Sequence, residues 1–273
     1  MYQSIIIEID AEVGILTLNR AERHNVLDRT LVDEMTAGLL ALDQAPGVRV
    51  IVISSTGKSF CAGTDPAWVR ETIQGTLESN LRDNRNLARL LATLAGVNKP
   101  TIARVQGPAS GIGVGLVAAC DIAFATYDTS FALNEVRYGL LPAVASPYLL
   151  AAMGERLCRY YMLTAERFSG VDAYRIGLVH EMVPDEEQLD EAIGETVETL
   201  LKNSAGAMGA CKALLRSIGG KSVNEMMTEE KAEETVQETA RRATLAQSSP
   251  EGRQGMLALV EKRKPEWAAK KND

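Results

Sequence analysis

The sequence predicts an α/β protein with a largely parallel sheet, followed by a region made only of helices. Two observations predict the sheet: the apolar runs at 48–55 and 121–126 are typical of buried strands, and loops and helical patterns separate them. Strands that alternate with helices in this way are joined by right-handed crossovers. A third observation predicts the helical region, because no convincing strand follows residue 184. We therefore expect a core over residues 1–200 and a helical region over residues 201–273.

The first half of the core begins with two strands, a helix and a third strand. Residues 4–10 and 13–19 alternate apolar and polar side chains around a short turn, which predicts a β-hairpin. Apolar positions between residues 31 and 42 recur with a helical period. The run VRVIVISS at 48–55 predicts a buried strand that ends in a polar, glycine-containing loop over 56–65.

The second half of the core repeats this order. A long helix rich in Leu and Arg is expected over 67–94, and a strand over 101–105 leads into a glycine-rich turn at 107–115. A short buried helix at 116–120 precedes the next strand at 121–126. The repetition of strand, loop and helix favours parallel pairing of the core strands.

The C-terminal region combines apolar helical stripes with little core of its own. Its helices are predicted over 189–201, 207–218, 223–246 and 252–262. An apolar stripe on a helix needs a surface to cover it. We expect this region to mediate self-association; the alternative is that its helices pack back on the sheet of the same chain.

Composition argues against several classes of function. A net charge of −7, from 36 acidic and 29 basic residues, argues against a nucleic-acid-binding surface. No apolar run approaches the roughly 20 residues that span a bilayer, and the acidic N-terminus lacks the features of a signal peptide, so we expect a cytoplasmic protein. The two histidines and four well-separated cysteines indicate neither a metal site nor disulfides, and we expect the cysteines to be small buried residues.

Two loops share one architecture, in which a buried strand ends in small residues before a helix begins. The first loop covers residues 59–65 and the second covers residues 107–115. Helix N-termini present unpaired N–H groups and the positive end of the helix dipole, and glycine allows a ligand to approach the backbone closely. Ligands of open α/β sheets gather at the carboxyl ends of the strands. If the two loops are neighbours, they aim two N–H donors at one oxygen atom.

The second loop also contains a G-x-G-x-x-A string, which is an alternative signature of dinucleotide binding. Its members are Gly113, Gly115 and Ala118. The dinucleotide motif follows the first strand of its sheet and has an acidic residue about 20 positions further on. Here the string lies in the middle of the chain, and the nearest candidate, Asp128, follows Gly113 by 15 positions. The dinucleotide interpretation is therefore the weaker of the two.

Five segments of the chain then point to a known family. They are Leu18-Asn19-Arg20 with Asn25, the string from Phe60 to Asp65, the turn over 105–115, the string from Leu163 to Phe168 with Gly177-Leu178-Val179, and the string from Glu261 to Trp267. Together they resemble the enoyl-CoA hydratase/isomerase (crotonase) superfamily, in its order, from about residue 5 to the C-terminus. The resemblance implies a spiral of ββα units with a helical C-terminal region for oligomerisation, assembled as a homotrimer or a dimer of trimers (a homohexamer).

The resemblance also implies the chemistry of the two loops. The substrate is an acyl-CoA whose thioester carbonyl oxygen lies between the backbone N–H groups of Thr64 and Ile112, which form an oxyanion hole. One such preorganised donor contributes roughly 2.7–4 kcal/mol to stabilisation of the enolate. The residues expected to face the adenine and pantetheine of CoA are Arg23, His24, Cys61, Ala62 and Asp65. No metal and no cofactor is implied, since CoA is part of the substrate.

One carboxylate of the family pattern is missing. Standard members that hydrate enoyl-CoA esters use two glutamates, and the position of the first is Gly115 in this chain. The second matches Glu135, which begins an otherwise apolar segment and is expected to be semi-buried with a raised pKa. The alternative is that Glu135 only caps a helix. Gly115 is expected to open space for a bulky or carboxylated acyl group, and Asp65, Arg137 and Tyr138 are conceivable helpers.

The segments at 115–121 and 135–148 narrow the hypothesis. They resemble bacterial hydratases of branched, carboxylated esters such as 3-methylglutaconyl-CoA and isohexenylglutaconyl-CoA. The leading hypothesis is a lyase of fatty-acid or branched-chain catabolism that adds water across a C2–C3 double bond. The alternatives are a Δ3,Δ2-enoyl-CoA isomerase with Glu135 as sole base, a non-catalytic CoA-ester-binding or scaffold protein, and a dehalogenase, decarboxylase or thioesterase of the same superfamily.

Overall fold

The structure is a computed structural model that describes residues 2–219, 226, 228 and 231–268. Internal contacts divide the chain into two units, Met1–Thr196 and Val197–Asp273. The first unit holds the sheets and most of the buried core, and the second contains helices. Each unit is described below by itself.

A six-stranded sheet forms the centre of the first unit, in the order β1-β2-β3-β4-β6-β9. Its strands are β1 (Ile5–Asp10), β2 (Val13–Leu18), β3 (Val50–Ser55), β4 (Thr101–Val105), β6 (Ile122–Thr126) and β9 (Glu181–Val183). Only β1 and β2 pair antiparallel, as the predicted hairpin, and every other neighbouring pair in this sheet is parallel. The predicted largely parallel sheet is confirmed.

The register of the sheet places the two small-residue loops side by side. Ile51 pairs with Thr101 and Ile53 pairs with Ala103, so β3 and β4 run in the same direction and end at the same edge. The loops that leave β3 and β4 therefore start next to each other, as expected for parallel neighbours.

A second, three-stranded sheet was not predicted. It consists of β5 (Ala109–Ser110), β7 (Ser130–Ala132) and β8 (Arg167–Ser169), in that order. Phe131 of β7 stacks on Phe168 of β8, with ring centroids 5.5 Å apart. Strands of two or three residues leave too little alternation in the sequence for a periodicity argument to detect them.

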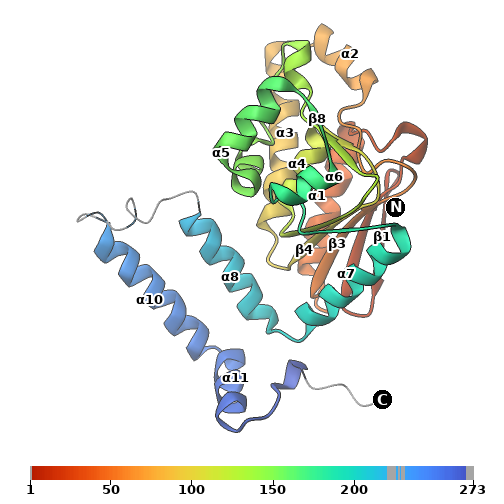
Figure 1. Ribbon diagram of the computed structural model, residues 1–273. Coiled ribbons are helices and arrows are strands. Elements are labelled where there is room, and N and C mark those ends of the chain that lie inside the picture. The colour runs from red at the N-terminus through yellow and green to blue at the C-terminus, as the bar shows by residue number, and fades with distance from the viewer. Residues whose placement is uncertain (1, 220–225, 227, 229–230, 269–273) are drawn as a thin grey trace. The chain divides into compact units, whose positions relative to one another are not determined.

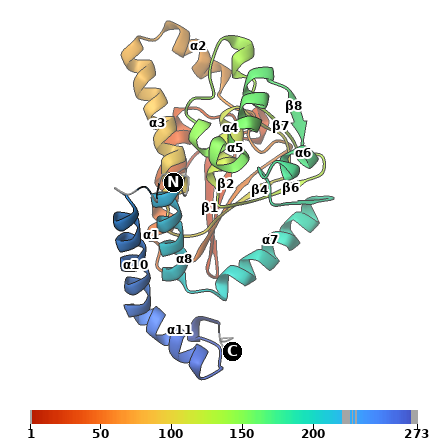
Figure 2. The same cartoon turned by 60° about the vertical axis from the view of Figure 1, so that its left-hand side comes forward.

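Helices α1, α3 and α4 of the first unit lie together beside the six-stranded sheet (Figure 1), and the core fills the space between these layers. The helices of this unit are α1 (Arg29–Gln44), α2 (Pro66–Gln74), α3 (Leu77–Gly96), α4 (Ile112–Ala119), α5 (Ser146–Thr164) and α6 (Gly170–Arg175), and short 3-10 turns are η1 (Ala21–Arg23) and η2 (Glu135–Tyr138). Helix α7 (Glu186–Leu201) begins in this unit and ends in the second. Figure 2 shows the same helices from a second direction, with α5 packed over α4.

Two helix predictions differ from the structure. The single helix expected over 67–94 is two helices, because α2 ends at Gly75 and Thr76 starts α3 by accepting a hydrogen bond from the Ser79 N–H. The buried helix expected over 116–120 begins earlier, at Ile112, so the glycine-rich turn forms the first turns of α4. In both cases the apolar pattern identified the helix but not its boundary.

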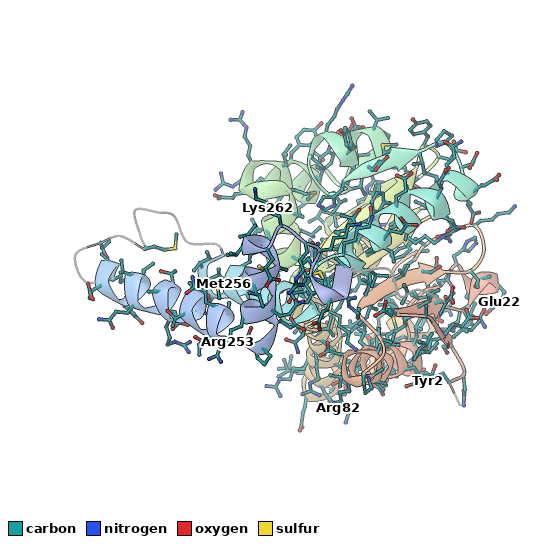
Figure 3. The ribbon with its side chains drawn as sticks, turned by 90° about the horizontal axis from the view of Figure 1, so that it is seen from below. Tyr2, Glu22, Arg82, Arg253, Met256 and Lys262 are labelled. Atoms are coloured by element: carbon teal, nitrogen blue, oxygen red, sulfur yellow. The ribbon has the colours of Figure 1, made fainter. Side chains whose placement is uncertain are left out.

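The second unit is helical and leaves many apolar side chains exposed. It contains α8 (Ala205–Ile218), α10 (Ala232–Ser248), α11 (Pro250–Val260) and η3 (Glu266–Ala268); the predicted helix start at residue 223 lies outside the described residues. Figure 3 labels Arg253 and Met256 on α11 and Lys262 just after it. The exposed apolar side chains of α11 are Met256, Leu257, Leu259 and Val260. Cys211 on α8 is exposed, so the expectation that all four cysteines are buried is wrong.

None of the helices in the described parts of the chain is both long and apolar enough to cross a membrane.

Candidate active site

The loop after β3, residues 59–65, alternates buried and exposed residues over its last five positions, 61–65. Cys61, Gly63 and Asp65 are buried, whereas Ala62 and Thr64 are exposed. The loop therefore has an inner side fixed by the protein and an outer side that carries Ala62 and Thr64.

A turn near the N-terminus holds this loop on both sides of Thr64. The Leu27 N–H donates to the Gly63 carbonyl at 2.7 Å, and the Asp65 N–H donates to the Leu27 carbonyl at 2.8 Å. Because its two neighbours make this parallel bridge, the N–H of Thr64 points to the opposite side of the strand. Across the described residues, this N–H donates to no other protein group.

The loop after β4, residues 107–115, presents its donor at a helix start. Gly111 has φ +53° and donates its N–H to the Ala132 carbonyl at 2.8 Å. Glycine tolerates this left-handed value at low cost. Ile112 is the first residue of α4, so its N–H has no acceptor within the helix.

The two loops are bonded to each other, which confirms the expectation that they are neighbours. The Ser110 N–H donates to the Cys61 carbonyl at 2.9 Å, and the Phe60 N–H donates to the Pro108 carbonyl at 3.1 Å. A Cβ atom at Gly113 would lie 2.3 Å from the Cys61 carbonyl oxygen. Only glycine permits this approach, and the same contact leaves no room for a pyrophosphate at Gly113, which argues against the dinucleotide interpretation.

Glu135 lies beside the start of α4, at the beginning of η2. A Cβ atom at Gly111 would be 3.1 Å from Oε1 of Glu135. Burial of this half-buried carboxyl raises its pKa above the ordinary value, as predicted. Oε2 is buried and has no hydrogen-bond partner among the described residues. A carboxyl group with an unused oxygen thus lies next to the turn that carries the Ile112 N–H.

The expectation that Gly115 opens space for a substrate is wrong. Gly115 is buried in α4, and a Cβ atom there would lie 2.8 Å from the Ala145 methyl and 3.3 Å from Cδ1 of Leu91. The segment that follows Glu135 returns to pack on α4 at this point and fills the space. Gly115 is therefore a close-packing position, and no second carboxylate lies there.

The residues expected to face CoA gather around Asp65. Asp65 is 3% exposed, pairs with Arg23 at 2.8 Å and Arg20 at 3.2 Å, and caps α2 by accepting from the Ala67 N–H. His24 approaches Ser59 through Nδ1 at 3.0 Å. A shallow cavity of about 200 Å³ lies here and is lined in part by Arg23 and Asp65. These contacts make Asp65 an anchor for the loop.

The other predicted site residues differ in how far they are buried and in how many hydrogen bonds they make with the rest of the protein. Both backbone polar groups of Cys61 are bonded to the second loop, and burial raises the pKa of its thiol to about 12. Ala62 is exposed and donates its N–H to the His24 carbonyl at 3.0 Å. Arg137 donates to the Ala165 carbonyl at 2.7 Å, and Tyr138 is 73% exposed. Their roles toward a substrate stay predictions.

Sequence reasoning missed a buried charge cluster that fixes α2 beside the first loop. Asp83 of α3 is 5% exposed and accepts hydrogen bonds from Nη2 of Arg29 at 2.6 Å and from Nε1 of Trp68 at 3.0 Å. The signal was a single acidic residue on the apolar stripe that includes Leu87 and Leu91. A charge on a buried face requires partners, so that position predicts a cluster of this kind.

Comparisons with known proteins show the family of the chain. Residues 8–270 match the family model described as enoyl-CoA hydratase/isomerase. A Mycobacterium bovis protein named probable enoyl-CoA hydratase is 32% identical over 270 residues, covering 97% of this chain and 98% of its own. A Pseudomonas fluorescens hydroxycinnamoyl-CoA hydratase-lyase is 32% identical over 220 residues, covering 77% of each chain.

A solved structure agrees over the same length. The crystal structure of an enoyl-CoA hydratase from Shewanella pealeana has a TM-score of 0.91 and 35% identity, covering 97% of this chain and 96% of its own. The α/β fold with a helical C-terminal region that the sequence predicted is therefore confirmed. The chain belongs to the enoyl-CoA hydratase/isomerase family and is an enzyme of that family.

Proposed function

We propose that this enzyme adds water across the C2–C3 double bond of a branched, 3-methylglutaconyl-like acyl-CoA, with Glu135 as its acid–base group. The observation that carries the proposal is the position of Glu135: its carboxyl lies beside the turn that leads into Ile112, and its Oε2 has no hydrogen-bond partner among the described residues. Burial raises the pKa of this half-buried carboxyl above its ordinary value, which makes it better able to accept and return a proton. The proposal needs no metal and no cofactor apart from the CoA carried by the substrate.

The reaction proceeds with two N–H donors and one carboxylate. The N–H groups of Thr64 and Ile112 hold the thioester oxygen, which gains negative charge as water oxygen bonds to C3 and the double bond opens. Ionised Glu135 takes one proton from that water and, once protonated, delivers a proton to C2. The product is a 3-hydroxyacyl-CoA, and Glu135 returns to its ionised form. Arg23 and Asp65 line the shallow cavity, which supports a role for this region in holding CoA. His24 and Ala62 are bonded to each other through the Ala62 N–H and the His24 carbonyl.

The nature of the acyl group rests on the segments around Glu135. Residues 115–121 and 135–148 resemble hydratases of branched glutaconyl-type esters, and Arg137 is an exposed cation two residues after Glu135. A cation at this position favours a substrate with a terminal carboxylate. We expect a kcat/KM for 3-methylglutaconyl-CoA about tenfold or more above that for 3-methylcrotonyl-CoA, which has the branch without the carboxylate.

The hydration assay follows loss of the enoyl-thioester absorbance. Wild type should consume 3-methylglutaconyl-CoA, and Glu135→Gln should lose about 100-fold or more in kcat. The exposed Glu155, which pairs with Arg159 on the same helix, supplies the control Glu155→Gln, with wild-type activity expected. Absence of turnover in wild type would contradict the proposed reaction.

A Δ3,Δ2-enoyl-CoA isomerase is the second candidate, because Gly115 is packed against Ala145 and brings no second carboxylate. One carboxylate suffices to move a proton between two carbons. Addition of a 3-enoyl-CoA separates the candidates: an isomerase raises the enoyl-thioester absorbance, whereas a hydratase acting alone does not. A Glu135→Gln variant as active as wild type on both substrates would instead favour a non-catalytic role for Glu135.

The proposal includes assembly as a homotrimer or a dimer of trimers in the cytoplasm. Exposed apolar side chains on the C-terminal helices support self-association, among them Leu215, Val236, Leu245, Leu257 and Val260. Apolar patches of this kind mark association surfaces. Light scattering of the purified chain should give a mass of three or six copies, and a monomer would overturn this part of the proposal.

A further inference from the structure

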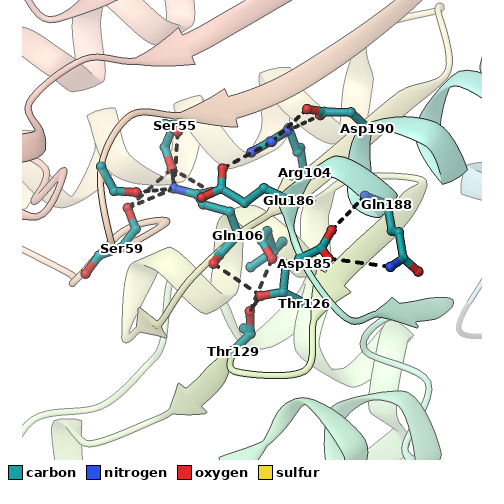
Figure 4. Close-up of polar contacts among 12 residues, drawn as sticks. Ser55, Ser59, Arg104, Gln106, Thr126, Thr129, Asp185, Glu186, Gln188 and Asp190 are labelled. Atoms are coloured by element: carbon teal, nitrogen blue, oxygen red, sulfur yellow. Dashed lines mark hydrogen bonds and ion pairs between the residues drawn. The ribbon is translucent and has the colours of Figure 1, made fainter.

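Gln106 connects the two loops that carry the proposed donors. It follows β4 directly and precedes Gly107, the first residue of the second loop. Its side chain extends to the segment between β3 and the first loop, where Nε2 lies 3.1 Å from the carbonyl of Ser55, the last residue of β3, and 3.0 Å from the Gly57 carbonyl (Figure 4). The Gln106 carbonyl is itself held by the Thr126 hydroxyl at 3.2 Å. Gln106 thus ties the first loop to a fixed point of the second.

Asn25 supports the first loop from the N-terminal side. It is fully buried and has φ +54°, a conformation that asparagine adopts more readily than most residues. Its Oδ1 accepts from the Arg20 N–H at 2.8 Å, and its Nδ2 donates to the Thr56 carbonyl at 2.8 Å and to the Ser59 carbonyl at 2.9 Å. Asn25 thereby fixes the turn whose Leu27 binds both neighbours of Thr64.

The two amides converge on one carbonyl. Nε2 of Gln106 lies 3.5 Å from the Ser59 carbonyl to which Asn25 also donates. Ser59 precedes Phe60, where the bonds between the two loops begin. Buried amides cost free energy unless they are bonded, and these two are bonded to the backbone leading into the first loop.

We propose that Asn25 and Gln106 are positioning residues that hold the Thr64 N–H in line with the Ile112 N–H. The inference rests on the proposed function, because it assigns both N–H groups to one carbonyl oxygen. Misplacement of a donor by a fraction of an ångström weakens a hydrogen bond that forms fully only in the transition state. Loss of either amide should therefore lower kcat more than it raises KM.

Thr101 supplies a matched control at the other end of β4. It is fully buried, donates to Oδ2 of Asp121 at 2.9 Å and accepts from the Asp121 N–H at 2.9 Å. Thr101→Val removes these bonds at nearly constant volume, far along the strand from the loops. It should lower stability without moving the donors.

The experiment compares Gln106→Met, Asn25→Asp and Thr101→Val in the full-length protein. Gln106→Met keeps length and removes the donor, and Asn25→Asp keeps shape and replaces Nδ2 with oxygen. We expect kcat to fall about 10- to 100-fold in the first two, with KM within about threefold. Thr101→Val should lower the melting temperature about as much as Gln106→Met and Asn25→Asp do, but keep kcat within about twofold of wild type. If one of the first two variants does not fold, the other still carries the test.

A spectroscopic measurement distinguishes an effect on the position of the N–H donors from an effect on the overall stability of the protein. The Glu135→Gln background slows turnover about 100-fold or more, so the red shift of the enoyl band of bound crotonyl-CoA, recorded before turnover, measures polarisation of its carbonyl. We expect Gln106→Met and Asn25→Asp in that background to lose about half of the shift or more, and Thr101→Val to keep it. An intact shift, or kcat values equal to those of Thr101→Val, would overturn the inference. Absence of the shift in Glu135→Gln alone would instead refute the proposed oxyanion site, and the inference with it.

Discussion

The loops after β3 and β4 present one N–H donor each, but they orient it by different means. In the loop over 107–115 the donor is oriented locally, because Gly111 turns the chain and α4 begins at Ile112. In the loop over 59–65 it is oriented by distant residues, since Leu27 binds the neighbours of Thr64. The orientation of the Ile112 N–H follows from a few adjacent residues, whereas the orientation of the Thr64 N–H depends on contacts that exist only in the folded chain. Substitutions at the contact between the loops should therefore affect activity and stability differently from substitutions at the distant residues that hold the first loop.

The largest effect is expected from Gly113→Ala, which forces the two loops apart. The added Cβ would lie 2.3 Å from the Cys61 carbonyl oxygen and 2.9 Å from the Cys61 Cβ. Overpacking of this kind costs about 1–3 kcal/mol in stability, and displacement of a donor costs about 100-fold in kcat. Denaturant unfolding and steady-state kinetics measure both.

Gly47→Ala is the control for this substitution, because nothing lies within 4 Å of its added Cβ. It should leave the activity of the enzyme unchanged and its stability within about 0.5 kcal/mol of wild type. Equal behaviour of the Gly113→Ala and Gly47→Ala variants would show that the loops do not depend on their mutual contact.

An intermediate effect is expected from Asp65→Asn, which tests the dependence of the first loop on distant charges. Asparagine still caps α2, but the ion pairs with Arg20 and Arg23 are lost. We expect KM for the CoA ester to rise about tenfold, or about 1.4 kcal/mol, with kcat nearly unchanged. Arg20 keeps its 2.7 Å contact with Asp28, so stability should fall by less than the roughly 3 kcal/mol typical of a broken buried pair.

Asp28→Asn is the matched control, since Asp28 caps α1 and pairs with the same Arg20 but leaves Arg23 bound to Asp65. It should change KM by less than about twofold, because Asp65 keeps its ion pairs with Arg20 and Arg23. A KM increase as large as that of Asp65→Asn would mean that any weakening around Arg20, and not the anchoring of the first loop, controls CoA binding.

The smallest effect is the change in stability expected from Glu135→Gln, a substitution beside the second loop. Burial raises the pKa of Glu135 above 4.5, so the folded state holds its proton to higher pH than the unfolded state does. The charged carboxylate therefore lowers stability above its folded pKa, and this penalty disappears below 4.5, where both states are protonated. Glu135→Gln should raise the melting temperature at neutral pH and leave it unchanged in acid. A gain that persists below pH 4 would contradict burial as its cause.

Much of the fold could be predicted because the relevant signals are local. The β-branched run of β3 and the alternating hairpin of β1 and β2 carry their own burial patterns. The break between α2 and α3 could not, since the Leu-rich and Arg-rich pattern continues across Gly75. The short strands β7 and β8 were also missed, because their pairing depends on Phe131 meeting Phe168.

Some features of the candidate site could likewise be predicted from the sequence, and others could not. The positions of Thr64, Ile112 and Glu135 follow from motifs, and the half-burial of Glu135 was expected from the apolar residues around it. The surroundings of Gly115 were not predictable, because Ala145 and Leu91 reach it from other elements. The roles of Asn25 and Gln106 were equally hidden, since each amide bonds to backbone atoms of a separate segment.

The sequence by itself determined the family, the parallel sheet and the identity of the small residues in both loops, because periodicity and motif order are properties of neighbouring residues. Only the tertiary structure decided which groups share a contact: the bonding of Cys61 to Ser110, the filling of the space beside Gly115, and the convergence of two buried amides on Ser59. The physical reason is that close packing and buried hydrogen bonds join atoms distant along the chain, and no local pattern records which partner each will meet.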